Sequence, residues 1–343
     1  MAMINLTLSR EYLYSRHRLS HQQIDAVLGE NRSKEYLAEK MQQLDKVRYF
    51  VQIIDLLQGG GIAFLCLKGP VLSQQLYNDP SVRLSHDVDL LLLDRTDMDR
   101  VDRLLVLQGY VGVDNLLWPE EKERQQMLMD GVHHLAYVHK EYGFMVEIHW
   151  SVYTPFSVRT KQFDRIIENN SQRIAFAGRE VVVFAPELNL LYLIIHGAKH
   201  GWQRLKWLVD IKDYPFDTVD SVKWMELVRE LKAERMVSQT GFLLCYFFNT
   251  TQPLLVIAKV PSFLKAYPLK MVDEEISEQG SVLGSLANLR YRLLLCKSFV
   301  YKLRLLQSMT IAPGDLFCIR SSSRLVYLLY RPYSYIKRRI VHA

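Results

Sequence analysis

The sequence has few cysteines, and none of them is spaced for a metal site or a redox pair. The four are Cys66, Cys245, Cys296 and Cys318, in a chain of 343 residues. A zinc site or a dithiol motif would need a CxxC pair or closely spaced Cys and His residues. Apolar neighbours flank all four, so we expect reduced thiols in the core of a cytoplasmic protein.

Long apolar runs are also missing. The longest, residues 188–195 and 241–248, are well short of the ~20 apolar residues that a membrane-spanning helix needs. The first residues do not combine a basic stretch with a following apolar one, as a secretory signal would. We therefore expect no membrane span and no secretory signal.

Acidic residues are scarce at the C-terminal end. Eleven Lys or Arg and one acidic residue, Asp315, lie between residues 290 and 343, whereas the net charge of the whole chain is only +6. Such a basic segment, rich in tyrosine here, either attracts an anionic partner such as nucleic acid, anionic lipid or an acidic protein, or is simply a solvated surface. We expect a terminal helix docked through Leu325, Leu328 and Leu329.

Two carboxylates, Asp87 and Asp89, lie two residues apart inside an apolar run. In an extended strand their side chains point the same way, while Val88 and Leu90 face the packing. Two carboxylates side by side on a buried strand repel each other, so one takes up a proton or a cation lies between them. Mg²⁺ prefers oxygen ligands and commonly combines carboxylates with substrate phosphates. The pattern predicts metal-assisted chemistry on a phosphate.

A turn formed by Lys68 and Gly69 precedes these acids, between an apolar strand and a helix over residues 71–77. A glycine here lets backbone N–H groups approach phosphates, and the N-terminus of the helix adds positive potential. Lys68 and Arg83 are candidate phosphate contacts. Alternatively, Lys68 points to solvent and Arg83 pairs with Asp79.

A third acid follows on a later alternating strand, residues 144–150. Glu147 and His149 share one face of this strand. If the strand lies next to the one with Asp87 and Asp89, Glu147 completes a three-carboxylate site. Taken alone, it is better explained as a solvent-facing residue of a half-exposed strand, because antiparallel sheets commonly have one face in water.

Two histidines, His196 and His200, are four residues apart and share a helix face. Their segment, HGAKH, lacks the glutamate of the zinc-protease helix. With Lys199, Lys206 and Asp210 they are expected either to line a ligand-binding cleft or to form a polar seam between helices. His133 and His134 are adjacent on a predicted strand, which places them on opposite faces.

Apolar periodicity divides the chain into an N-terminal helical segment (1–58), an α/β core (59–185) and a helical domain with a basic tail (186–343). Strands are expected at 62–67, 87–93, 132–139, 144–152 and 181–184, in a region whose part 109–150 is mostly strand and loop. Helices are expected at 33–57 with Ser33 as its cap, 71–77, 94–108, 188–200, 203–214, 222–231, 235–248, 286–307 and 323–330.

Four segments, in this order, carry a resemblance to a known family: 67–77, 83–90, 147–150 and 196–210. The chain resembles the bacterial uncharacterised nucleotidyltransferase family, a branch of the polymerase-beta-like nucleotidyltransferase superfamily, from about residue 45 to about residue 335. The resemblance implies an α+β fold, with a mixed sheet flanked by helices and a helical C-terminal domain.

The resemblance also implies an activity: transfer of a nucleotidyl group from a nucleoside triphosphate to a hydroxyl or similar acceptor. Asp87, Asp89 and Glu147 are then the catalytic residues and the ligands of Mg²⁺ or Mn²⁺. The chain departs from the wider superfamily in having Lys68 and Gly69 where a Gly-Ser turn is usual, and Glu rather than Asp as third acid. The expected contacts to the nucleotide or acceptor are Lys68, Gly69, Arg83, His149, His196, Lys199, His200, Lys206 and Asp210.

Neither the nucleotide nor the acceptor follows from the residues, and a small molecule, a protein or peptide, or an RNA end each fits the acceptor. The main alternative is a catalytically silent nucleotide-binding or adaptor protein of the same fold. A nucleic-acid-binding protein driven by the basic tail is a third reading, but no known nucleic-acid motif supports it.

Overall fold

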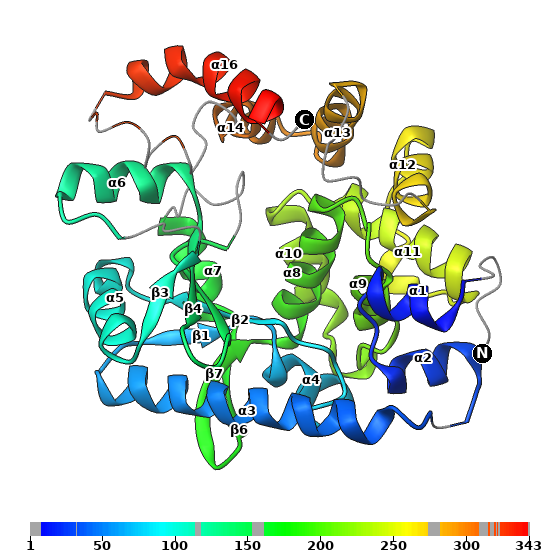
Figure 1. Ribbon diagram of the computed structural model, residues 1–343. Coiled ribbons are helices and arrows are strands. Elements are labelled where there is room, and N and C mark those ends of the chain that lie inside the picture. Colours follow the sequence, from blue (N-terminus) through cyan, green and yellow to red (C-terminus); the bar gives the residue numbers. More distant parts are fainter. Residues whose placement is uncertain are drawn as a thin grey trace.

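Seven strands form one mixed sheet with helices on both sides (Figure 1). The computed structural model describes residues 8–31, 33–113, 118–152, 161–273, 282–308, 315, 319, 321 and 323–341. The strands follow the order β3-β4-β5-β2-β1-β7-β6. They are β1 (Phe64–Cys66), β2 (Asp87–Leu92), β3 (Tyr110–Gly112), β4 (His134–His139), β5 (Met145–His149), β6 (Ser171–Phe176) and β7 (Arg179–Phe184). The predicted mixed sheet with flanking and C-terminal helices is confirmed.

Helices before, between and after the strands make up most of the remaining described chain. Those up to the end of the sheet are α1 (Arg10–Ser15), α2 (His21–Leu28), α3 (Tyr36–Gly59), α4 (Pro70–Tyr77), the 3₁₀ turn η1 (Arg95–Asp97), α5 (Met98–Leu107), α6 (Lys122–Gly131) and α7 (Lys161–Asn169). Those after it are α8 (Pro186–Lys199), α9 (Leu205–Lys212), η3 (Phe216–Thr218), α10 (Ser221–Glu230), α11 (Glu234–Phe248), η4 (Pro253–Leu255), α12 (Ser262–Asp273), α13 (Val282–Leu295), α14 (Phe299–Ser308) and α16 (Arg324–Val341).

Strand β2 lies near the middle of the sheet and separates two apolar cores. Val88, Leu90 and Leu92 belong to the core that also contains the buried residues of α3 and α5. Leu91, on the opposite face, belongs to the core built around α8. Because side chains alternate along a strand, Asp87 and Asp89 share the face of Leu91 and so point toward α8.

Helix α8 is the centre of the helical region. It contacts α9, α10 and α11, and most of its residues are buried, which explains its almost continuous apolar sequence. It begins at Pro186, where the missing proline N–H costs nothing in the first turn. Its C-terminal turn, which holds His196 and Lys199, is left to face the sheet.

Several elements differ from the sequence-based expectation. Helix α6 lies within a region predicted to be strand and loop, because its sequence has few apolar residues in a regular period. Helices α7 and α12 and strand β6 were not predicted either. The single helix expected over 286–307 is two helices, α13 and α14. Ser298 separates them, and its hydroxyl accepts a hydrogen bond from the Tyr301 amide. Ser33 does not cap α3, which begins at Tyr36 without a side-chain cap.

Two expectations about apolar residues were wrong. Cys245 is exposed rather than in the core, while Cys66 and Cys296 are buried; Cys318 lies outside the described residues. The three leucines expected to dock the terminal helix α16 are exposed, and Tyr327 is the buried residue instead, with its hydroxyl donating to the Ile319 carbonyl. None of the described helices combines the length and hydropathy needed to cross a membrane.

A contact between α8 and the turn after it predicts an intolerant glycine. Gly197 packs against the fully buried ring of Trp202 so closely that an added Cβ would overlap the ring. We expect Gly197→Ala to lower the free energy of unfolding by about 1–3 kcal/mol through overpacking. Gly59→Ala is the matched control, because a Cβ at the end of α3 meets no atom within 4 Å. Urea denaturation of both variants measures the difference, and equal stability would contradict the close packing.

Candidate active site

The parallel pairing of β2 with β5 brings the acids of two distant segments together. In its register Asp89 lies directly beside Glu147, and Leu91 beside His149. Asp89 and Glu147 therefore face the same side of the sheet as neighbours on adjacent strands. The strand that carries Glu147 is next to the strand that carries the Asp pair, which is the arrangement that a three-carboxylate site requires.

His149 lies between the two carboxylates. Its Nε2 atom is 3.2 Å from Asp89 Oδ1 and 3.2 Å from Glu147 Oε2. Oxygen and nitrogen donor atoms of these three residues all lie within 4.8 Å of one another. Asp89 is 2% exposed, so its charge is held away from bulk water.

Positive groups compensate for the buried Asp89 carboxylate. Lys68 Nζ lies 3.1 Å from Asp89 Oδ1. Although burial works to raise it, the Lys68 ammonium and His149 hold the pKa of Asp89 well below its usual value. Burial works to lower the pKa of His149, but hydrogen bonds to Asp89 and Glu147 raise it above the ordinary value. Lys68 does not point to solvent, because it is largely buried. Burial works to lower the pKa of Lys68, but Asp89, Tyr192, Asp87 and Glu147 together raise it above the ordinary value.

Asp87 lies at the start of β2, next to the Lys68–Gly69 turn. It is half-buried and lines the same cavity as Asp89 and Glu147, although it belongs to neither group of clustered donor atoms among the described residues. A Cβ on Gly69 would lie 3.8 Å from the Asp87 carbonyl oxygen. Gly69 has φ of 73° and ψ of −146°, a backbone conformation that essentially only glycine adopts. The turn therefore brings the first N–H groups of α4 close to Asp87.

His133 and His134 lie on the same side of the sheet, contrary to the alternation expected for neighbours on a strand. Their ring centroids are 4.5 Å apart, and both line the cavity. The reason is that β4 begins only at His134, so His133 precedes the strand and does not follow its alternation. Together with His149 they form a cluster whose ring nitrogens lie within 4.8 Å of one another. Burial lowers the pKa of His134 to about 4 and that of His133 well below its usual value.

Helix α8 supplies the opposite wall of the cavity. His196 and His200 pack against Trp207 of α9, with ring centroids 5.4 and 5.2 Å away. Lys199 Nζ is 3.5 Å from His133 Nε2 across the cavity. Burial, followed by the charges of Arg292 and Lys68, lowers the pKa of Lys199 to about 7. The predicted polar face of α8 thus lies opposite the acids across the cavity, and it is not only a polar seam between helices.

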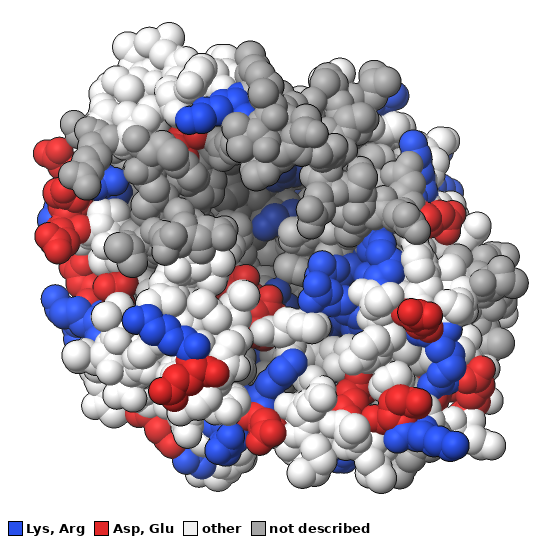
Figure 2. All heavy atoms as spheres, viewed as in Figure 1, with Lys and Arg blue, Asp and Glu red and all other residues white. Residues whose placement is uncertain are grey.

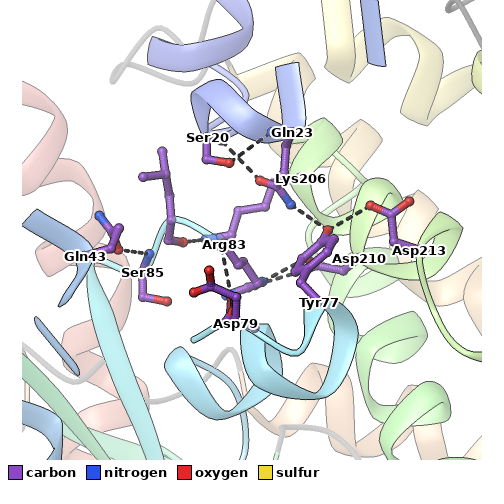
Figure 3. Close-up of polar contacts among 12 residues, drawn as sticks. Ser20, Gln23, Gln43, Tyr77, Asp79, Arg83, Ser85, Lys206, Asp210 and Asp213 are labelled. Carbon is purple, nitrogen blue, oxygen red and sulfur yellow. Dashed lines mark hydrogen bonds and ion pairs between the residues drawn. The ribbon is translucent and has the colours of Figure 1, made fainter. Parts of the chain in front are cut away.

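Arg83 and Asp210 form a buried ion pair that fastens α9 to the loop before β2 (Figure 3). Arg83 Nε and Nη2 donate to the two Asp210 oxygens at 2.8 and 2.9 Å. The expected alternative partner of Arg83, Asp79, instead pairs with Lys40. Breaking such a pair typically costs about 3–5 kcal/mol, because the remaining charge stays buried. Arg83 also lines the cavity, so it both holds the wall and contributes positive charge there.

Lys206 lies beside this pair and is also buried. Its ammonium donates to the Leu84 carbonyl (Figure 3). Burial and the neighbouring Arg83 lower the pKa of Lys206 well below its ordinary value. Lys206 therefore lines the cavity, whereas Asp210 does not, and both hold the loop that leads into β2.

A cavity of about 400 Å³ encloses all of these groups except Gly69 and Asp210. It is within the size range of small-molecule and nucleotide sites. Ten lining residues were not among the site residues predicted from the sequence: Arg18, His86, His133, His134, Val152, Tyr192, Ile195, Gln203, Arg204 and Trp207. Of these, the adjacent histidines 133 and 134 stood out in the sequence, but the alternation expected along a strand argued against their lying on the same face.

The family model described as "Uncharacterised nucleotidyltransferase" matches residues 11–249. This chain belongs to that family. The match includes both acid-bearing strands, the histidine helix α8 and the N-terminal helices α1 and α2. No curated protein and no solved structure matches the chain significantly. Membership supports nucleotidyl transfer in general terms.

The buried histidines of the cavity predict a loss of stability in acid. Burial lowers the pKa of His133, His196 and His200 well below 6.5, so the unfolded chain binds protons that the folded chain does not. The free energy of unfolding is expected to fall as pH drops below about 6.5, by at most about 1.4 kcal/mol per pH unit for each histidine. Urea denaturation at about pH 7 and about pH 5 measures the difference.

His149 acts in the opposite sense, because its pKa is raised in the folded chain. The contribution of His149 to the free energy of unfolding is fully present below the pKa that histidine has in the unfolded chain. It is lost as pH rises through the higher pKa of His149 in the folded chain. The histidines with a lowered pKa outnumber it, because burial also lowers the pKa of His17, His86 and His134, so the net effect keeps the predicted sign. His200→Asn should weaken the pH dependence. Stability that is equal or higher at about pH 5 would refute the prediction.

Proposed function

We propose that this chain is a metal-dependent nucleotidyltransferase that moves a nucleotidyl group from a nucleoside triphosphate to a hydroxyl or similar acceptor. The observation that carries the proposal is the convergence of Asp89, Glu147 and His149 within 4.8 Å on one wall of a cavity that Asp87 also lines. Family membership supports the reaction class. The metal, the triphosphate donor and the acceptor are the parts that the proposal adds.

The donor set fits Mg²⁺ or Mn²⁺. Carboxylate oxygens of Asp89 and Glu147, with Asp87 at the edge, are hard ligands, and the nearby imidazole of His149 suits Mn²⁺ better than Mg²⁺. When bound, such an ion supplies Lewis-acid polarisation of phosphate oxygens and lowers the pKa of a bound hydroxyl. Without it, Lys68 and His149 provide the charge that keeps two neighbouring carboxylates together.

In the reaction, the acceptor oxygen forms a bond to the α-phosphorus, and the bond from that phosphorus to the pyrophosphate oxygen breaks. The N-terminus of α4, which follows Gly69 beside Asp87, adds positive potential near the phosphate oxygens. The acceptor proton passes to a neutral base. The candidates for this base are His133, His134 and Lys199, which line the cavity together on the Glu147 side. No nucleophile from the chain is needed, because positioning and electrostatics carry most of this chemistry.

One observation favours the alternative, a nucleotide-binding protein without catalysis. The Lys68 ammonium and the His149 imidazole already contact Asp89, and they neutralise charge that a metal ion would otherwise neutralise. A nucleotide could then bind through the cationic groups of the cavity alone. Metal dependence of the activity separates the two functions.

Removal of either clustered carboxylate is expected to abolish transfer. The protein is incubated with each α-³²P-labelled nucleoside triphosphate, Mg²⁺ or Mn²⁺ and a cell extract as the source of acceptors. We expect Asp89→Asn and Glu147→Gln to lower label transfer by at least about 100-fold, since even outer-shell changes at metal sites cost 10–100-fold. Asp45→Asn, which alters an exposed carboxylate on α3, is the matched control and should transfer label normally.

Transfer that persists in both site variants would exclude these carboxylates as metal ligands. Nucleotide binding without transfer, unchanged by removal of the divalent metal with a chelator, would support the silent alternative. Loss of transfer in the chelated protein and recovery with Mn²⁺ would support the enzyme.

A further inference from the structure

Arg18 reaches the cavity from the N-terminal helices, far in sequence from the acids. It follows α1, where the Arg18 amide donates to the Tyr14 carbonyl and the Leu19 amide to the Leu13 carbonyl. These two hydrogen bonds close the end of the helix. Arg18 itself has the left-handed backbone conformation there, at a position that usually holds glycine. Arg18 has φ of 56°, which is costly for a residue with a Cβ.

The residues on both sides of Arg18 hold it in place. The Arg16 guanidinium donates to the carbonyl oxygens of Gln203, at 2.6 Å, and Met271, at 3.0 Å. The His17 ring accepts a hydrogen bond from the Leu205 amide at the start of α9. Leu19 is fully buried. The strained turn is therefore fastened to the helical region, and this fixes the backbone from which Arg18 reaches the cavity.

Further contacts tie α2 to the same wall. The Gln23 amide donates to the Tyr77 hydroxyl at 2.9 Å, and this hydroxyl donates to Asp213 at 2.8 Å, next to α9 (Figure 3). The N-terminal helices are thus part of the cavity wall rather than a separate attachment.

Arg18 has no acidic partner among the described residues, and its neighbours are cations. Burial, and then the positive charges of Arg18, Lys46, Lys206 and Arg204, lower the pKa of His86 to about 4. Lys and Arg side chains gather beside the hollow in Figure 2. Unpaired cations held close together repel each other, so the arrangement is unfavourable until an anion binds.

The two arginines differ from the two lysines in what they contact. Lys46 donates to the Ser85 carbonyl and Lys206 to the Leu84 carbonyl, so both ammonium groups hold the loop before β2. Arg204 lies over the Trp207 ring at 5.8 Å, and its buried Nε has no hydrogen-bond partner in the described chain. Arg18 and Arg204 are therefore the groups whose hydrogen-bond donors remain for a ligand.

This cationic end of the cavity is the Asp87 end. The negative charge of Asp87 works to raise the pKa values of Arg204, Lys46 and Lys206, and so opposes the lowering that burial causes. Gly69 and the N-terminus of α4 adjoin Asp87 as well. The histidines 133 and 134 lie by Glu147 instead. The cavity thus has a cation-rich end beside Asp87 and a histidine-lined end beside Glu147.

We propose that Arg18, together with Arg204, forms a polyphosphate-binding subsite that clamps the β- and γ-phosphates of the nucleotide donor; this rests on the proposed nucleotidyl transfer. The guanidinium group suits the task because its fork of N–H donors matches phosphate oxygens. The left-handed backbone at position 18 is explained by this role, since glycine would relieve the strain but lose the contact.

The strain makes a sharp test possible. Arg18→Gly removes the guanidinium and relieves the backbone, so its melting temperature should equal or exceed that of the unaltered chain. Arg18→Gln removes the charge and keeps the strain. Arg48→Gln, an exposed arginine on α3 outside the cavity, makes the same change in net charge and is the control.

Isothermal titration with inorganic tripolyphosphate and with each nucleoside triphosphate, in Mg²⁺, measures the subsite. We expect both Arg18 variants to bind tripolyphosphate and the preferred nucleotide about 10- to 100-fold more weakly, as loss of hydrogen bonds to a charged group predicts. The Arg48 variant should bind within about twofold of the unaltered chain. Adenosine and the other nucleosides, which lack phosphate, should show no dependence on Arg18.

Equal tripolyphosphate affinity of Arg18→Gly and the unaltered chain would overturn the subsite. If label transfer depends on Asp89 while the Arg18 variants bind normally, only the subsite fails. If the variants lose affinity but no transfer is found, the subsite stands and the enzymatic function fails. An unaltered chain that binds neither tripolyphosphate nor any nucleotide would overturn both.

Discussion

The parallel register of β2 and β5 is the constraint on which the site depends. It makes Asp89 and Glu147 direct neighbours, and it places His149 within 3.2 Å of both carboxylates. A shift of one residue would turn either acid toward the apolar core of α3 and α5. The register is held by the buried side chains of the opposite face, including Val88, Leu90 and their β5 partners Val146 and Ile148. Apolar packing on one face thus sets the chemistry on the other.

Keeping two carboxylates near each other in a partly buried place requires positive charge, and the surrounding elements supply it. Lys68 contacts Asp89 from the turn before α4, and α8 brings Lys199 to the opposite wall. The pair of Arg83 with Asp210 fastens α9 across the same cavity. The contacts of Lys199 with His133 and of Arg83 with Asp210 join the sheet region to the helical region. The site is therefore a property of how the two regions pack, and the N-terminal helices with Arg18 complete its wall.

The sequence predicted the mixed sheet with its helical region through the resemblance to the nucleotidyltransferase family, and the apolar residues of β2, β5 and α8 located the two strands and the helix that carry the site. It also predicted that Asp87 and Asp89 share a face with each other, and Glu147 with His149. It could not predict the partners of Arg83 or the approach of Arg18, since these contacts span more than a hundred residues and leave no local pattern. His133 was misjudged because alternation applies only inside a strand, and β4 begins one residue later. Short helices such as α6, with few apolar residues, were missed for lack of a period.

The most direct measurement of the central claim is the position of a divalent cation in a crystal of the protein grown with Mn²⁺ and a non-hydrolysable nucleoside triphosphate analogue. Manganese is located by its anomalous scattering, independently of any activity. The account predicts a peak at coordination distance from the carboxylates of Asp89 and Glu147, with the analogue's phosphates beside it. Bound analogue without a manganese peak at these two carboxylates would contradict the account.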